Sequence, residues 1–234
     1  MEADQARLLG GDVDLLARHR RVGDGFVRSS YLKFDMEKAS HGEVYKLLIG
    51  LIAPRPIALI TSMDEHGGLN AAPFSAFNYF CTDPPIVGIG VTNRTDRAFV
   101  PKDTARNIRR TGEFVVNVVS ASIAAQANVT AAEVGPEVDE FVLAGLTPLA
   151  SEAVRPARVA EAPAQMECKL LQVIYTNHAP GGGVIVLGEV LRFHVRQDLI
   201  EDFRVDPAGL DAVGRMAGNT WVHTRDRMEL TRPK

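Results

Sequence analysis

Residues 55–75 read RPIALITSMDEHGGLNAAPFS, and this stretch decides the fold class. Residues 56–62 are rich in aliphatic and β-branched side chains and predict a short strand. The acidic and glycine residues at 64–68 predict a turn, after which residues 69–74 return as a second extended segment. Two extended segments joined by a short turn predict a β-hairpin.

Further β-rich runs follow the hairpin. Asp83-Pro84-Pro85 excludes a helix and precedes the first of them. Residues 184–195 are apolar on both faces, which indicates a strand covered on both sides, as in a closed barrel with a helix or a second subunit against it. Because helices are few and no βαβ rhythm occurs, the sequence predicts a mainly β fold, an antiparallel β-barrel with peripheral helices. The later runs are residues 86–91, 113–120, 165–178 and 184–195.

One short helix is well signalled between these runs. Asp103 or Thr104 can act as its N-cap, and Gly112 stands where a C-terminal cap belongs. Residues 121–149 predict a helix followed by irregular chain. Residues 1–30 differ in character, and we interpret them as an N-terminal extension, either a short helix or disordered, ahead of one domain at 31–234.

Composition excludes several classes of function. With 234 residues and a net charge of -3, the chain can bury one sizeable core or two small ones, and nothing attracts it globally to nucleic acid or an anionic membrane. The longest apolar run, residues 47–53, is too short to span a membrane. No export signal is evident, so the cytoplasm is the default compartment. Cys81 and Cys168 are expected to be reduced thiols, and the spacing of the six histidines predicts no metal site.

Positive charge is concentrated in residues 93–110, which hold six basic and two acidic residues. Lys102-Asp103-Thr104 stands at the helix N-terminus, where free amide groups and the helix dipole favour a phosphate. Asp103 would itself repel a phosphate, so we expect it to cap the helix or to orient Lys102. The alternative is a solvated helix face. Nucleic acid is disfavoured, because only Phe99 is near enough for base stacking.

A second constellation is residues 70–78, NAAPFSAFN. Its small residues would let a planar ring approach the backbone closely. Asn70, Ser75 and Asn78 supply donors and acceptors that can match the pyrimidine edge of such a ring. The alternative is an ordinary turn region over the core. Together the two constellations describe a surface that takes a planar ring and grips a phosphate, as a site for flavin mononucleotide (FMN) must.

An ordered series of motifs carries a family resemblance. The chain resembles the flavin reductase-like family with the FMN-binding split-barrel fold, which includes flavoredoxin, over roughly residues 40–225. The motifs are residues 54–62, residues 70–75, Asp83-Pro84-Pro85, Lys102-Asp103-Thr104 and residues 111–117.

The resemblance implies a homodimer with FMN at or near the subunit boundary. It assigns the phosphate to Thr61, Ser62, Lys102 and Thr104, with Arg55 and Arg94 as helpers and Asp103 beside them. It assigns the flavin ring to Asn70, Ala72, Pro73, Phe74, Ser75 and Asn78. In residues 214–218, GRMAG, Ala217 replaces a glycine of the family pattern, which leaves open the contact to the nicotinamide or substrate side.

The expected function is that of an FMN-binding oxidoreductase. It accepts hydride from NADH or NADPH and passes electrons to oxygen, free flavin or a partner such as a monooxygenase. The cofactors carry this chemistry, so no catalytic residue is named. The alternatives are a flavin-binding electron carrier or sensor without NAD(P)H activity, or another split-barrel enzyme of the pyridoxamine-phosphate oxidase-like or haem-handling kind.

Overall fold

The computed structural model describes residues 32–93, 101–135, 137–179 and 181–233. The chain divides into two units, one of residues 40–226 and one that combines residues up to 39 with those from 227 onward. In the described part of the smaller unit, the Lys38 amide donates to the Asp35 carbonyl at 3.1 Å. The N-terminal extension expected at residues 1–30 lies outside the described residues.

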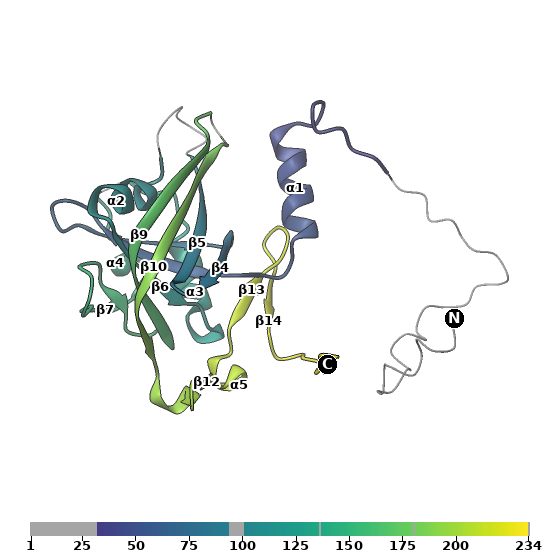
Figure 1. Cartoon of the computed structure of the whole chain (residues 1–234). Coiled ribbons are helices and arrows are strands. Elements are labelled where there is room, and N and C mark those ends of the chain that lie inside the picture. Colours follow the sequence, from purple (N-terminus) through teal and green to yellow (C-terminus); the bar gives the residue numbers. More distant parts are fainter. Residues whose placement is uncertain (1–31, 94–100, 136, 180, 234) are drawn as a thin grey trace. The chain divides into compact units, whose positions relative to one another are not determined.

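Among the described residues of the larger unit, seven strands form the main sheet. All neighbouring pairs are antiparallel, and the sheet curls into a barrel (Figure 1). This confirms the mainly β, split-barrel prediction. The strands, in their order across the sheet, are β3 (Leu69–Phe74), β2 (Ala58–Met63), β6 (Glu113–Val118), β9 (Ala164–Asn177), β10 (Gly183–Val195), β5 (Pro85–Thr92) and β4 (Phe77–Thr82).

The barrel interior holds one apolar core. Successive side chains of a strand point to opposite faces, so Ala58 and Ile60 of β2 enter this core while Leu59 points away from it. The Phe114 ring of β6 lies against Gly188 of β10, where a Cβ atom would come within 2.4 Å of the ring. Glycine is therefore required at this position for the ring to pack.

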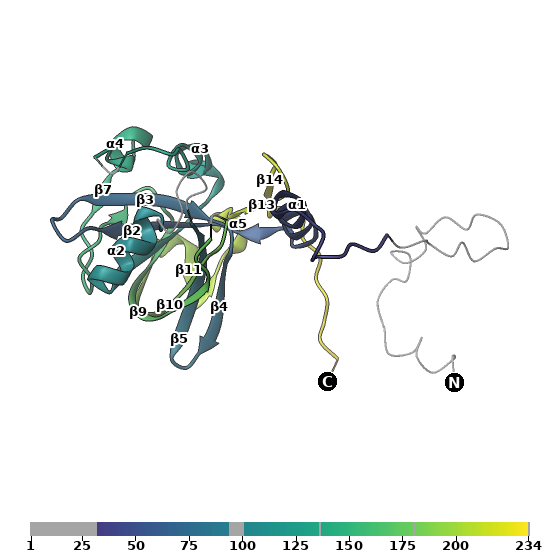
Figure 2. The ribbon, with the colours of Figure 1, turned by 90° about the horizontal axis from the view of Figure 1, so that it is seen from above.

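A second apolar core lies on the other face of β2 and β3. It is covered by the short helices α3 (Ala124–Val129) and α4 (Glu140–Ala144), which Figure 2 shows on that side of the sheet. Phe141 of α4 is 1% exposed and anchors the layer. Residues 121–149, for which the sequence predicted a helix followed by irregular chain, form this covering layer. Short elements complete it: η2 (Ala121–Ile123), β7 (Pro148–Leu149) and β8 (Arg158–Val159).

The predicted short helix is α2 (Asp103–Thr111), and Gly112 closes it with a left-handed φ of 75°. The predicted N-cap is wrong by one residue, because Lys102 occupies that position. Asp103 lies in the first helical turn, and its carboxylate reaches one turn along to Arg106, with 2.6 Å between Oδ1 and Nη1. The buried side of α2 packs mainly against β2.

The sequence analysis did not predict β4 or the helix α1 (His41–Leu51). Ser40 and Glu43 form a capping box at the start of α1, yet no residue of this helix is buried. A small sheet of β1 (Arg55–Pro56), β13 (Val213–Arg215) and β14 (Trp221–His223) follows. The other elements are η3 (Gln197–Leu199), β11 (Ile200–Glu201), β12 (Arg204–Val205) and α5 (Pro207–Leu210).

The expectation that β10 is covered on both faces is not met within one chain. Val184, Val186 and Val190 are buried on the barrel side, whereas Ile185 and Leu191 on the outer side are exposed by 36% and 45%. In the part of the chain that the structure describes, no helix is both long and apolar enough to cross a membrane.

Candidate functional site

A hollow of about 110 Å³ lies where the start of α2 meets the edge strand β3. The loop at residues 130–134 and Glu140 of α4 form its other wall, and Figure 2 shows how α2, β3 and α4 surround this region. Seven of the residues that the sequence assigned to FMN line the hollow: Asn70, Ala72, Pro73, Phe74, Lys102, Asp103 and Thr104.

The start of α2 presents donors to the hollow. Lys102 is the N-cap but makes no side-chain capping bond, so the first-turn amides of the helix rely on other acceptors. Thr104 is 1% exposed, and its Oγ1 accepts a hydrogen bond from Asn70 Nδ2 at 3.1 Å. The hydroxyl proton of Thr104 therefore remains available to donate. A helix N-terminus, an ammonium group and a hydroxyl together suit an anion.

Asp103 does not cancel this positive character, because its carboxylate is held by Arg106. The pair belongs to a helix whose last turn carries Arg109 and Arg110 as well. On the α2 side of the hollow, a negative group therefore meets the ammonium of Lys102 and a carboxylate that is already neutralised by a guanidinium.

The Asn70–Thr104 hydrogen bond joins two groups that the sequence placed at opposite ends of FMN. Asn70 was assigned to the ring and Thr104 to the phosphate, yet the structure brings them into contact. A strand rises about 3.3 Å per residue, so β3 extends about 13 Å from Asn70 to Phe74. Asn70 thus lies at the same end of the hollow as Thr104, and residues 72–74 continue along the strand away from it.

Thr61 and Ser62 do not reach the hollow. Both side chains are fully buried. The Thr61 hydroxyl donates to the Ala157 carbonyl at 2.5 Å, and Ser62 Oγ accepts from Asn107 Nδ2 at 3.4 Å. The structure places both hydroxyls inside the fold, where they hold β2 to its neighbours, so their assignment to a phosphate stays a prediction.

Arg55 also acts within the fold. Its guanidinium donates to the carbonyls of Ile49, Ile52 and Met216, at 2.8, 2.6 and 3.1 Å, and to Ser75 Oγ at 3.3 Å. These bonds join the end of α1, the turn after β3 and the residue that follows β13. Arg55 and Ser75 are absent from the lining of the hollow, so a direct contact with a ligand is not what the structure shows for them.

Two of the residues predicted to bind FMN have still to be placed, Asn78 and Arg94. Asn78 lies at a different groove, about 650 Å³ and mainly apolar, and its Oδ1 accepts from the neighbouring amide of Tyr79. Asn78 is not among the residues that line the hollow around Lys102. Arg94 lies outside the described residues.

Comparison with known proteins assigns the chain to a family. The sequence profile of the flavin reductase like domain matches residues 51–213, which is more than half of the chain. The chain belongs to this family.

Three relatives illustrate the similarity. An uncharacterized protein of Halalkalibacterium halodurans is 38% identical over 204 residues, which cover 86% of this chain and 97% of the relative. Nitrilotriacetate monooxygenase component B from Bacillus cereus is 36% identical, with a TM-score of 0.81 over 86% of this chain and 99% of its own. The 2-nitrobenzoate 2-nitroreductase NbaA of Pseudomonas fluorescens is 33% identical, with a TM-score of 0.77 over 86% and 96%. Family and neighbours together support a flavin-binding oxidoreductase.

In this flavin reductase-like chain, sequence reasoning missed Glu140 and the loop at 130–134. Glu140 Oε2 accepts a hydrogen bond from the Ala71 amide of the edge strand at 3.3 Å. Partial burial raises the pKa of the Glu140 carboxyl, and the nearby charges of Asp103 and Asp139 add to the rise. The only local signal in the sequence was Asp139, whose carboxylate caps α4 through the Phe141 and Val142 amides.

Proposed function

We propose that the chain binds FMN and works as an oxidoreductase that accepts hydride from NADH or NADPH. The observation that carries the proposal is the hollow in which Lys102, Thr104 and the start of α2 lie beside the edge strand β3. This hollow places groups that suit an anion next to an edge strand, and the chain belongs to the flavin reductase-like family.

The residues present fit FMN. The phosphate would be held by the Lys102 ammonium, the Thr104 hydroxyl and the first amides of α2, with Asn70 positioning the Thr104 hydroxyl. Ala72, Pro73 and Phe74 would lie along the ring, because small side chains and an edge strand let a planar group approach the backbone. Bound FMN supplies two-electron chemistry with nicotinamide nucleotides, and the chain contributes binding and orientation.

The electron acceptor is proposed from the neighbours' names. One neighbour is component B of a monooxygenase, which favours delivery of electrons to a partner oxygenase, with oxygen and free flavin as simpler acceptors. Another is a nitroreductase, so a second candidate is direct reduction of a small aromatic substrate by this chain. NADH consumption that accelerates on adding a nitroaromatic compound, without any second protein, would favour the second candidate.

The absorbance spectrum of the purified protein tests flavin binding directly. We expect a flavin spectrum as isolated or after addition of FMN, and anaerobic bleaching by NADH or NADPH. Bleaching by dithionite alone would identify an electron carrier or sensor instead. A colourless protein whose thermal midpoint does not move with micromolar FMN would contradict the proposal.

Substitution of Lys102 tests the phosphate end. Lys102→Ala should weaken FMN binding about tenfold or more, because it removes a charged donor, while riboflavin, which lacks the phosphate, should change little. Isothermal titration with both flavins measures the two affinities. The matched control is Arg109→Ala, which removes a positive charge from the exposed end of the same helix. Equal losses for FMN and riboflavin would refute the phosphate assignment.

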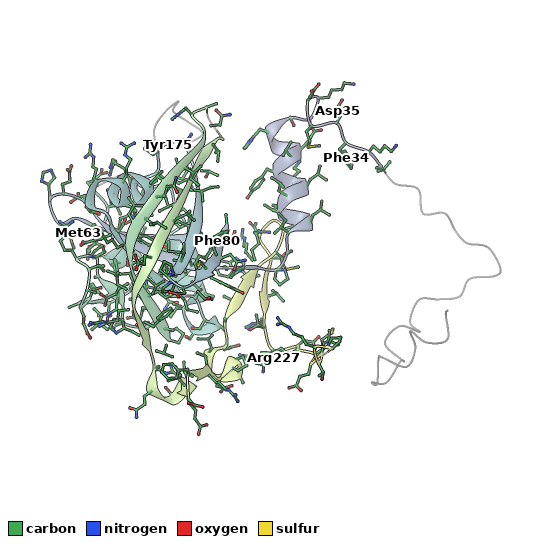
Figure 3. The ribbon with its side chains drawn as sticks, viewed as in Figure 1. Phe34, Asp35, Met63, Phe80, Tyr175 and Arg227 are labelled. Carbon is green, nitrogen blue, oxygen red and sulfur yellow. The ribbon has the colours of Figure 1, made fainter. Side chains whose placement is uncertain are left out.

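We also propose that the chain is a homodimer that pairs through the outer face of β4, β5 and β10. Gly88 and Gly90 make this face flat, and the Phe80 ring and the Leu187 side chain lie over Gly88. Phe80, labelled in Figure 3, projects from β4 and is 62% exposed. Contiguous apolar surface of this kind marks an interface. An 11-residue helix is marginal on its own, so α1, which buries none of its residues, also favours a partner.

A further inference from the structure

Glu140 stands in the hollow assigned to the phosphate, although its charge opposes a phosphate. It lines the same space as Lys102 and Thr104. Its position is fixed, because it begins α4, whose Phe141 is buried in the second core, and because Oε2 accepts from the Ala71 amide at 3.3 Å. The carboxylate therefore cannot withdraw without breaking a hydrogen bond to the edge strand.

Among the residues that the structure describes, the charges around Glu140 do not neutralise it. Asp103 is paired with Arg106, so this guanidinium is already engaged. Asp139 is occupied in capping α4. A smaller hollow shares Asp103 and Glu140 with the first one. The titratable and charged groups that line either hollow or shift the pKa of Glu140 are Lys102, Asp103 and Arg106 from α2, Asp64 from the β2–β3 turn, Glu133 from the loop, and Asp139, which precedes α4. Among these described groups, the Lys102 ammonium is the cation left for both Glu140 and a ligand.

A phosphate monoester carries about 1.5 to 2 negative charges at neutral pH. Two like charges in one partly buried space strongly disfavour each other, and the usual outcome is that the pair takes up one proton, shared between the carboxylate and the phosphate. Partial burial has already moved the pKa of Glu140 upward, so the step costs less here than at an exposed carboxylate.

We propose that Glu140 sets the affinity and the pH dependence with which this hollow holds a phosphate-bearing flavin, because its carboxylate and the phosphate together take up one proton from solvent as the phosphate enters. The inference rests on the proposed function. At neutral pH the ionised carboxylate weakens retention of FMN below what Lys102 and Thr104 alone would provide. The site is thereby tuned for exchange of FMN rather than for permanent binding.

The sign of the pH effect follows from linkage. Below the pKa of Glu140 in the free protein, which lies above the ordinary 4.5, the carboxyl is already protonated and does not oppose the phosphate. As the pH rises through that pKa, the affinity of the wild-type chain for FMN falls relative to a chain that lacks the charge. The free FMN phosphate also titrates, but it does so identically with both proteins. Dividing the affinity of wild type by that of the variant therefore removes this contribution.

Glu140→Gln is the test, because the amide keeps an oxygen for the Ala71 amide and removes the charge. At pH 7 it should raise the affinity for FMN about tenfold and leave riboflavin within twofold of wild type. Titration in two buffers of different ionisation enthalpy should show that wild type takes up at least about half a proton more than Glu140→Gln does. The matched control is Glu137→Gln, an exposed carboxylate on the same segment but outside the hollow.

The outcomes separate the two proposals. Wild type that binds no flavin overturns the proposed function and this inference together. Wild type that prefers FMN to riboflavin, with Glu140→Gln equal to wild type in affinity and proton uptake, overturns the inference alone. If Glu140→Gln melts well below wild type, Glu140→Met provides the same comparison with a neutral side chain of similar length. Equal effects of Glu137→Gln and Glu140→Gln would show a general charge effect and also overturn it.

Discussion

Glu167 of β9 shows how much one side chain can organise. It is fully buried, and its two carboxylate oxygens accept from the amides of Glu152, Ala153 and Val154 at 2.5–3.2 Å and contact His194 Nε2 at 2.6 Å. Burial alone would raise the pKa of Glu167, but the amide donors and His194 outweigh it, and the pKa lies below the ordinary 4.5. The carboxylate thus fixes the segment between β7 and β8 against the sheet.

Glu167→Gln should lower the free energy of unfolding by about 3 kcal/mol at pH 7, because buried amide donors lose a charged acceptor. Since the folded-state pKa is depressed, the stabilisation is present above about pH 4.5 and is lost as the pH falls through the lower folded value. Urea unfolding from pH 7 downward measures both effects. The glutamine chain should lack this acid-side loss.

The matched control is Glu113→Gln, which breaks the more exposed pair between Glu113 and Arg155. Exposed ion pairs contribute about 1 kcal/mol or less. If Glu113→Gln and Glu167→Gln destabilise the chain equally, the special role of the buried carboxylate is refuted.

Individual residues also show how much of the candidate site can be predicted from the sequence. The position of Lys102 and Thr104 at a helix start was predictable, because a basic and a hydroxyl residue before a helical segment form a local pattern. The burial of Thr61 and Ser62 was not, because it depends on which neighbours cover each face of β2, and Ala157 and Asn107 come from distant segments. Glu140 was missed for the same reason, since only folding brings α4 to the Ala71 amide.

At the scale of elements, α2 depends on how it ends. Gly112 has a φ of 75°, and a Cβ atom there would meet nothing within 4 Å. Substitution therefore tests conformation alone, without a steric clash. Gly112→Ala should lower the free energy of unfolding by about 1 kcal/mol, because a residue with a Cβ atom is disfavoured in the left-handed region. Gly112→Asn should lose less, because asparagine tolerates this conformation.

Gly42 supplies the control for that comparison. It lies inside α1 with right-handed backbone, and its added Cβ would also meet nothing within 4 Å. Gly42→Ala should be neutral or stabilising by up to about 1 kcal/mol. Chemical denaturation of the three variants measures the differences, and a loss at Gly42 as large as at Gly112 would contradict the conformational explanation.

Elements with strong local signals were predictable, and those without were not. The hairpin of β2 and β3 follows directly from the turn at 64–68, and the long strands β9 and β10 from the β-rich runs at 165–178 and 184–195. Helix α1 was not predicted. Ser40 and Glu43 form a capping box at its start, but the helix has no stripe of buried apolar residues that packs against the rest of the chain. Strand β4 was hidden because its first residues, 77 and 78, fell in a segment that resembles a turn region, and its pairing with β5 cannot be read from the sequence.

At the scale of the molecule, the barrel has an outer face that one chain leaves exposed. Ile185 of β10 pairs directly with Ile174 of β9 on one side and with Gly90 of β5 on the other, so it lies at the centre of a flat apolar surface. The apolar pattern on both faces of β10 did predict a cover, but the sequence could not say whether the cover belongs to this chain.

Ile185→Glu tests whether a second copy is that cover. A carboxylate buried without a partner at an interface costs about 3 kcal/mol or more, so the dimer dissociation constant should rise at least about 100-fold. Light scattering coupled to size exclusion over a range of concentrations measures the change. Leu149→Glu introduces the same charge at an exposed apolar residue of β7 and should leave the dimer intact. A wild-type chain that is monomeric at every concentration, or an Ile185→Glu dimer as tight as wild type, would show that this face pairs with something other than its own copy.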